Sequence, residues 1–131
     1  MIIYCDGCFD LIHYGHYNFL KIAKSKADKL IVGIHNDKQI ENYKRIPILT
    51  MEQRVPMLEG CKYVDEVIID SPLILTNEFL KEHNIDAIVI PTNRKKEEIE
   101  EWYKDIEVLI ISVPYTSEIS TSNIINKLKT L

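Results

Sequence analysis

The chain has 131 residues, of which 46% are hydrophobic and 27% are charged, and this balance is typical of a globular protein and excludes a largely disordered one. Its 16 basic and 20 acidic residues leave a net charge of -4, which argues against broad binding to nucleic acid. No apolar run approaches the about 20 residues of a membrane span, and the start of the chain does not have the pattern of a signal peptide. We therefore expect one domain over residues 1–131, cytoplasmic, without a nucleic-acid or membrane partner.

The first half of the chain predicts strands and helices in alternation. An apolar strand at residues 1–5 is followed by helical spacing of apolar residues over 16–27. A second buried strand is expected at 29–37. After it, Thr50 and Gln53 form the capping box of a helix at 51–61. A third strand is expected at 64–70.

The second half continues the same rhythm. Thr76 can cap a short helix at 77–84, and an apolar strand follows at 86–90. A charged helix at 95–105, a fifth strand at 106–113 and a last helix at 120–131 complete the prediction. The strands are apolar without alternation, which indicates a parallel sheet covered on both faces. We predict a doubly wound, Rossmann-like α/β fold with five parallel strands, whose ligands bind outside the carboxyl ends of the strands.

The cysteines, Cys5, Cys8 and Cys61, bear on metal binding and on compartment. Cys5 and Cys8 have the spacing of half a zinc site, but no second pair follows them. We interpret all three as reduced side chains that bind no metal, which agrees with a cytoplasmic location.

The first strand-to-helix turn, "CDGCFDLIHYGH", combines two glycines with two histidines. Gly7 is expected to supply unusual dihedral angles for a tight turn, and Gly15 to let a ligand approach the helix start. A helix N-terminus favours an anion such as phosphate. His13 and His16 are three residues apart and can share one face of the first turn, where their imidazoles could donate to phosphate oxygens.

The ten residues "GCFDLIHYGH" resemble the GxFDxxHxGH signature of the cytidylyltransferases that act on phosphocholine, phosphoethanolamine and glycerol phosphate. The resemblance spans residues 4–128 and is nearest to the phosphocholine and phosphoethanolamine enzymes. It implies that His13 and His16 are catalytic. It also implies a nucleotide-binding role for Gly7, Cys8, Phe9, Asp10 and Gly15, with Asp10 orienting the site or a Mg²⁺ ion.

Two further regions carry the resemblance. Lys44, in a loop, and Arg54, early in a capped helix, match the positions of a substrate-side lysine and arginine, and we expect both cations to close over the phosphates. The stretch "ISTSNII" resembles a triphosphate-binding helix start, so Ser120, Thr121 and Ser122 are expected at the β- and γ-phosphates, with one of them serving as a plain N-cap.

The sequence departs from the family in two places. Tyr115 and Glu118 stand where relatives have the arginine and glycine of "RTEG". The fourth strand ends in "PTNRKK" instead of "HDD" or "GDD", so Thr92 and Asn93 are left to hydrogen-bond the base of the nucleotide, without a carboxylate. The basic residues 94–96 either compensate for the lost groups with positive charge or form the solvated start of a helix, and we favour the second interpretation.

The resemblance implies transfer of CMP from CTP to phosphocholine or phosphoethanolamine, with release of pyrophosphate and with Mg²⁺ bound to the nucleotide. It also implies a homodimer. Because of the two departures, three alternatives stay open: glycerol 3-phosphate as the acceptor, another nucleotide as in an adenylyltransferase, and a non-catalytic nucleotide-binding paralogue.

Overall fold

The structure is a computed structural model that describes residues 1–114, 116 and 119–131. Five strands form one sheet in the order β3-β2-β1-β4-β5, and every neighbouring pair is parallel. The strands are β1 (Ile2–Gly7), β2 (Lys29–Ile34), β3 (Glu66–Ile69), β4 (Ala87–Pro91) and β5 (Leu109–Val113). The predicted five-stranded parallel sheet is confirmed.

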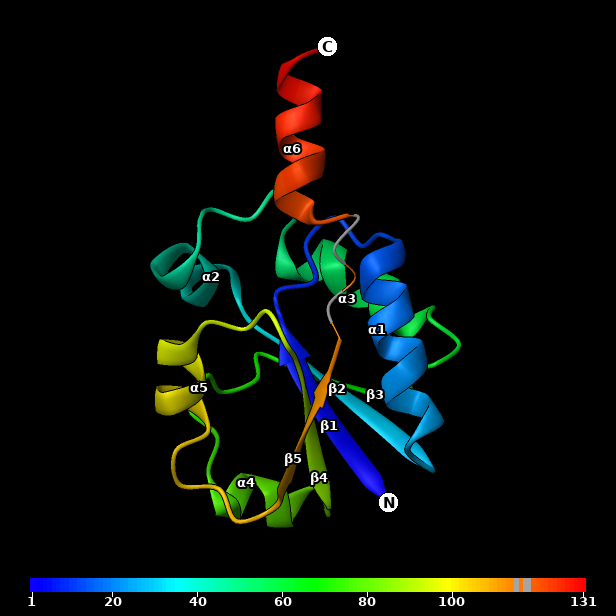
Figure 1. Cartoon of the computed structure of the whole chain (residues 1–131), viewed down its shortest axis with the longest axis vertical. Helices are drawn as coiled ribbons and strands as arrows, with labels where there is room; N and C mark the ends of the chain where they lie inside the picture. Colours follow the sequence, from blue (N-terminus) through cyan, green and yellow to red (C-terminus); the bar gives the residue numbers. More distant parts are fainter. Residues whose placement is uncertain (115, 117–118) are drawn as a thin grey trace.

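Helices cover both faces of this sheet (Figure 1). They are α1 (Tyr14–Ser25), α2 (Asp37–Tyr43), α3 (Met51–Glu59), α4 (Asn77–Glu82), α5 (Lys96–Trp102) and α6 (Thr121–Lys129). Helices α1 and α3 pack on one face, and α4 and α5 pack on the other. Helix α6 extends away from the sheet beyond the carboxyl ends of the strands (Figure 1).

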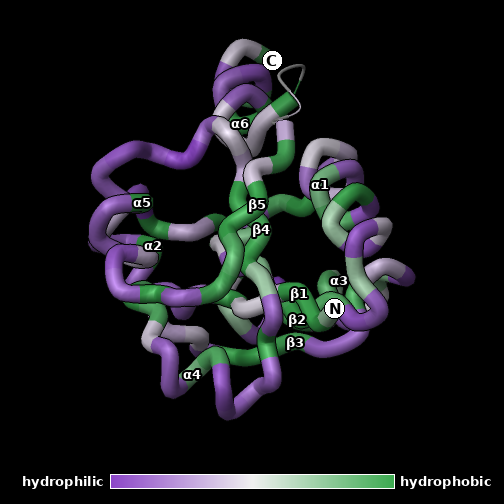
Figure 2. The backbone as a smooth tube through the Cα atoms, turned by 60° about the horizontal axis from the view of Figure 1, so that its bottom comes forward, coloured by the Kyte–Doolittle hydropathy of each residue, from purple (hydrophilic) through white to green (hydrophobic). Residues whose placement is uncertain are grey.

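The core is divided by the sheet because successive strand residues point to opposite faces. In β1, Ile3 and Cys5 join the cluster under α1 and α3, whereas Tyr4 between them joins the cluster under α4 and α5. All three side chains are fully buried. The strands are correspondingly hydrophobic in the centre of the molecule, and the outer helices carry most of the hydrophilic positions (Figure 2).

Helix α2 is the element that the sequence prediction missed, because the expected second strand included its first residue and no element was predicted between that strand and the helix at 51–61. Its start has a clear signal. Asn36 accepts a hydrogen bond from the backbone of Gln39, and the Gln39 side chain accepts one from the backbone of Asn36. This is the same reciprocal capping box that correctly marked α3 at Thr50 and Gln53.

Among the described residues, no helix combines the length and the apolar character that crossing a bilayer requires. The strand order changes direction between β1, which is the central strand, and its neighbour β4. The loops that leave their carboxyl ends therefore diverge, and a ligand-sized crevice is expected between them.

Candidate active site

A cavity of about 580 Å³ opens at this point, outside the carboxyl ends of the strands. Its walls come from the ends of β1, β2, β4 and β5 and from the starts of α1 and α6. Most of the site residues expected from the sequence line it: Gly7, Cys8, Phe9, His13, Gly15, His16, Lys44, Ser120, Thr121 and Ser122. Within the described part of the chain, Asp10, Arg54 and Thr92 stand outside this lining, whereas Asn93, expected beside Thr92 at the base, is part of it.

The two histidines form the cap of helix α1. His13 is the N-cap residue, and its Nδ1 accepts a hydrogen bond from the backbone N–H of Gly15 at 3.0 Å. The Nδ1 of His16 accepts from the backbone N–H of His13 at 3.2 Å. A backbone amide can only donate, so each neutral ring must carry its proton on Nε2. The backbone thus fixes both imidazoles as Nε2–H donors, with ring centroids 4.0 Å apart.

Both histidines are neutral near pH 7. Burial, together with the nearby His13 and Lys44, lowers the pKa of His16 to about 3. Burial and the charge of Lys44 also lower the pKa of His13. A pair of neutral donors can bind phosphate oxygens without the mutual repulsion of two imidazolium ions, and it can gain strength as negative charge develops on those oxygens.

The turn that presents the histidines has an unusual backbone, but not at the glycine where it was expected. Phe9 and Leu11 both have φ of 52°, while none of the described glycines has a positive φ. The prediction that Gly7 supplies unusual dihedral angles is therefore wrong. Its small size matters instead, because a Cβ there would lie 3.2 Å from the Phe9 ring. Left-handed Phe and Leu are strained, and such strain occurs at functional sites where surrounding contacts hold it.

Gly15 is required by the histidine cap itself. A Cβ at this position would lie 2.8 Å from Cε1 of His13 and 3.0 Å from its Nδ1. This contact lies within the chain and is a separate reason for glycine at this position; the predicted approach of a ligand to Gly15 stays a prediction.

Asp10 anchors a loop instead of facing the cavity. Its buried carboxylate accepts hydrogen bonds from Arg45 at 2.8 Å and from the backbone N–H groups of Ile48 and Leu49 at 2.7 and 3.0 Å. Burial would raise its pKa, but these partners outweigh burial and lower the pKa. The carboxylate is thus charged, and these three contacts direct it to the segment that follows Lys44.

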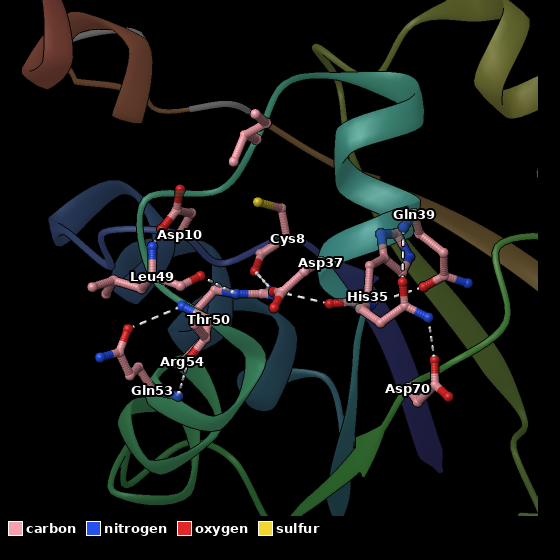
Figure 3. A network of polar contacts seen from close by, with 12 residues as sticks. Cys8, Asp10, His35, Asp37, Gln39, Leu49, Thr50, Gln53, Arg54 and Asp70 are labelled. Carbon is pink, nitrogen blue, oxygen red and sulfur yellow. Dashed lines mark hydrogen bonds and ion pairs between the residues drawn. The ribbon is translucent and has the colours of Figure 1, made fainter.

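Arg54 is fully buried, which differs from the expectation that it closes over phosphates. Its guanidinium donates to the backbone carbonyls of Leu49, Cys8 and His35. It also pairs with the carboxylate of Asp37 at 2.7 Å. Figure 3 shows these contacts converging on one side chain from the loops after β1 and β2 and from the α2–α3 loop. In this structure Arg54 joins the loops that frame the cavity.

Lys44 is placed as expected for a cation at the cavity. It follows the last residue of α2, its side chain is exposed, and it lines the cavity. Asp10 fixes the chain immediately after it, through Arg45 and the Ile48 and Leu49 amides. A long cationic side chain on such an anchored base can reach a phosphate while keeping its own freedom.

The start of α6 forms the opposite wall. Ser120 is the N-cap, and its hydroxyl accepts from the backbone N–H of Asn123 at 3.0 Å, which confirms that one of the three hydroxyl residues is a plain N-cap. The Thr121 hydroxyl donates to the backbone carbonyl of Asp10 at 2.8 Å. These contacts hold the helix N-terminus against the β1–α1 turn. Tyr115 and Glu118, where the sequence departs from the family, lie outside the described residues.

The far end of the cavity was not anticipated from the sequence. Arg94, which we expected to be solvated, has a side chain only 11% exposed and pairs with the buried carboxylate of Asp6. That expectation is wrong for Arg94, although Lys95 and Lys96 are exposed. Trp102 and Tyr103 complete this end of the site, with the Tyr103 hydroxyl donating to Asp6 at 2.9 Å. The signal was the lone Asp6 inside an otherwise apolar strand, which required a buried partner.

The Asp6 carboxylate is charged. Burial would raise its pKa, but the imidazole of His35, the guanidinium of Arg94 and the phenol of Tyr103 together lower the pKa below its ordinary value. The described residues contain no group of three histidine, cysteine or acidic side chains that could hold a metal ion by themselves.

Comparison with known proteins agrees with this geometry. A family model described as cytidylyltransferase-like matches residues 4–127. The ethanolamine-phosphate cytidylyltransferase of Mus musculus is 45% identical over 87 residues, which are 66% of this chain and 22% of that protein. The FAD synthase of Thermococcus sibiricus is 38% identical over 130 residues, which are 93% of this chain and 88% of that protein.

A solved structure, the lipopolysaccharide core biosynthesis protein from Thermoplasma volcanium, superposes with a TM-score of 0.76 at 26% identity and covers 89% of this chain and 98% of its own. The chain spans about a quarter of the ethanolamine-phosphate relatives that it matches, with 22%, 27%, 22% and 24% of their lengths covered. The family match, by contrast, runs through almost the whole chain and includes both capping histidines and the α6 start. The chain belongs to the cytidylyltransferase-like family.

Proposed function

We propose that this chain is a nucleotidyltransferase that moves CMP from CTP to the phosphate of phosphoethanolamine or phosphocholine. One observation carries the proposal: two neutral imidazoles, each fixed as an Nε2–H donor by a backbone amide, line the same cavity as the N-terminus of α6. The names of the relatives support the choice of nucleotide and acceptor.

The reaction is an in-line displacement at the α-phosphorus. An oxygen of the acceptor phosphate forms a bond to that phosphorus, the bond to the bridging oxygen breaks, and pyrophosphate leaves with the electron pair. The acceptor phosphate is already a nucleophile, so the protein acts by positioning and by stabilising charge. The Nε2–H groups of His13 and His16 donate to oxygens whose negative charge grows in the transition state.

Two features of the cavity suit the remaining phosphates. The free N–H groups and the partial positive charge at the α6 N-terminus suit the β- and γ-phosphates. Lys44 suits the open side of the cavity, where its ammonium neutralises charge on the leaving pyrophosphate. Mg²⁺ is proposed only as an ion carried by the nucleotide, where it would neutralise phosphate charge, because the described residues do not form a metal cage of their own.

A second candidate, transfer of AMP from ATP, is favoured by one observation. The FAD synthase relative matches along 88% of its own length, which is far more than the ethanolamine-phosphate relatives do. The same histidines, lysine and helix start would act on either nucleotide, because they contact phosphates and not the base.

The test is release of pyrophosphate from each of the four ribonucleoside triphosphates. The acceptors are phosphoethanolamine, phosphocholine, glycerol 3-phosphate and FMN, each offered with each nucleotide. Release with CTP and an amino-alcohol phosphate supports the proposal, whereas release with ATP and FMN supports the second candidate. Binding of nucleotide without release under any pairing contradicts both and supports a non-catalytic paralogue.

The expected homodimer and cytoplasmic location belong to the same proposal. Sedimentation of the purified chain tests the dimer, and a mass equal to the 15.3 kDa monomer at all concentrations would contradict it.

A further inference from the structure

Tyr43, the residue directly before Lys44, ends helix α2 with its side chain turned into the protein. Its hydroxyl contacts Nδ1 of His35 at 2.7 Å. Its ring packs edge-on against the rings of His35 and Trp102, with centroids 5.6 and 5.1 Å away. Those two rings are themselves buried, with 0% and 5% of their residues exposed. The end of α2 is thus fixed to the interior by one side chain, through a hydrogen bond and aromatic packing.

The direction of this hydrogen bond follows from the other side of the His35 ring. Its Nε2 pairs with Oδ2 of the buried Asp6 at 3.6 Å. Because the Asp6 carboxylate is charged, it favours the imidazole proton on Nε2, which leaves Nδ1 as the acceptor of the neutral ring. Burial raises the pKa of the Tyr43 phenol above its ordinary value, so the hydroxyl keeps its proton and donates it to Nδ1. Asp6 therefore sets the tautomer of His35, and His35 holds Tyr43.

Lys44 stands between two residues that are both tied to buried partners. On one side Tyr43 is held by His35, and on the other side Arg45 pairs with Asp10 at 2.8 Å. Lys44 itself leaves the helix with φ of -137° and ψ of -76°, while its backbone N–H donates to the carbonyl of Ile40 at 2.8 Å. The exposed lysine side chain thus starts from a backbone that is fixed at both neighbours.

The place of this backbone matters for the charge that Lys44 brings to the site. Its ammonium contributes to lowering the pKa of both His13 and His16, so it lies within electrostatic reach of both imidazoles. In a site that acts by positioning, a displacement of about 1 Å can lower the rate by about 100-fold. Residues that fix the base of Lys44 are therefore expected to act on the reaction without touching the reacting atoms.

We infer that Tyr43 and His35 are positioning residues, which act by holding the base of Lys44 at the cavity. The inference rests on the proposed function, in which Lys44 neutralises charge on the leaving pyrophosphate. The hydrogen bond between Tyr43 and His35 is the contact that sets the lysine, and both residues act through Lys44 alone.

A double-mutant cycle tests the inference. Tyr43→Phe removes the hydroxyl and keeps the ring packing, and it should lower kcat for pyrophosphate release by about 10-fold, with a smaller change in KM for the nucleotide. In a Lys44→Gln protein the same change should alter kcat by less than about 2-fold, because the ammonium to be positioned is gone. An equal loss in both backgrounds, or an unchanged kcat in the single variant, overturns the inference.

Tyr17→Phe is the matched control. The Tyr17 hydroxyl also bonds to another side chain, that of Tyr63 at 3.3 Å, but Tyr17 is exposed and lies outside the lining of the active-site cavity. The control should keep the native kcat in both backgrounds. A loss equal to that of Tyr43→Phe would mean that the effect is not specific to the base of Lys44.

The other partner of the bond gives a second pair of variants. The amide oxygen of Asn can replace Nδ1 as an acceptor, whereas Leu provides no acceptor. His35→Asn should therefore retain more of the native kcat than His35→Leu does. Equal kcat values for these two variants would contradict the role given to the hydrogen bond.

Trypsin cleavage after Lys44 separates this inference from the proposed function, since cleavage needs no turnover. We expect Tyr43→Phe to be cleaved there several-fold faster than the native protein. Faster cleavage in a protein that transfers no nucleotide would refute the proposed function and leave the anchoring of Lys44 in place. An unchanged cleavage rate contradicts the anchoring, whatever the activity.

Discussion

The backbone N–H of His13 donates to the Nδ1 of His16, so one histidine of the pair fixes the tautomer of the other. His13 is in turn fixed by the backbone of Gly15. The helix cap therefore has a chemical purpose in addition to its structural one. A Ser or Asp cap would satisfy the same backbone N–H groups, whereas an imidazole satisfies them through Nδ1 and presents an N–H donor at Nε2 on the opposite side of a rigid ring.

His16→Ala should lower kcat by about 100-fold or more, because the variant loses a donor whose hydrogen bond strengthens in the transition state. The measurement is pyrophosphate release at saturating nucleotide. KM for the nucleotide should change less than kcat. An unchanged kcat in a folded variant would exclude His16 from the reaction.

Gly15→Ala should lower kcat by about 100-fold, since the new methyl group would lie 2.8 Å from the His13 ring and force it to move. Gly60→Ala is the matched control: it lies at the end of α3, has φ of -79° and meets only the Pro56 carbonyl at 3.3 Å. The control should retain activity. Comparable losses in both variants would mean that the position of the His13 ring is not what matters.

Stability should fall as the pH is lowered from about 6.5 toward 4.5. The folded pKa of His16 is about 3, so below its unfolded pKa of about 6.5 the unfolded chain binds a proton that the folded chain does not. Protonation of the unfolded state then favours unfolding, at up to about 1.4 kcal/mol for each pH unit. Urea denaturation at a series of pH values measures the slope.

The neutral variant His16→Gln should show a shallower slope over this window. The carboxylates whose pKa is lowered, including Asp6 and Asp10, act by the same linkage below about pH 5, so the difference between the two slopes is read between about pH 6.5 and 5. A slope identical to that of the native protein would contradict the assignment of a buried neutral imidazole to His16.

Arg54→Met should lower the free energy of unfolding by about 3 kcal/mol, because it leaves the buried carbonyls of Cys8 and His35 without a donor. Asp37→Asn is the comparison: the Asp37 side chain is 44% exposed, so its ion pair with Arg54 is screened and its loss should cost less than about 1 kcal/mol. Urea denaturation measures both. Equal costs would mean that the ion pair, and not the joining of the loops, is the main contribution of Arg54.

Asp10→Asn should loosen the loop after Lys44, because the amide replaces the carboxylate that binds Arg45 and two backbone N–H groups. Limited trypsin digestion is a direct readout, since Lys44 and Arg45 are themselves cleavage sites. Cleavage there should be several-fold faster in the variant. The same rate in both proteins would show that Asp10 does not hold this loop.

The sequence was informative wherever one residue's role depends on its neighbours in the chain. Apolar runs located all five strands, and the spacing of His13 and His16 located the site. It was less informative where a side chain's direction depends on distant elements. Asp10 lies in the motif and Arg54 in a later helix. Apart from Leu49, which is five residues before Arg54, the partners of both side chains lie 17 to 46 residues away, and no local pattern reports which way such side chains point.

Arg94 illustrates the same limit. It stands in a run of basic residues that is typical of a solvated helix start, but its partner Asp6 is 88 residues away and becomes its neighbour only because β1 and β4 pair in the sheet. Helix α2 is a different case, because the Asn36 and Gln39 capping signal was present in the sequence and was overlooked.

The most direct test of the central claim is a crystal structure of the protein with CTP. The account predicts that oxygens of the triphosphate lie within about 3 Å of Nε2 of His13 and of His16, with the terminal phosphates at the start of α6. Phosphates bound at another surface, with both imidazoles making no contact to the nucleotide, would contradict it.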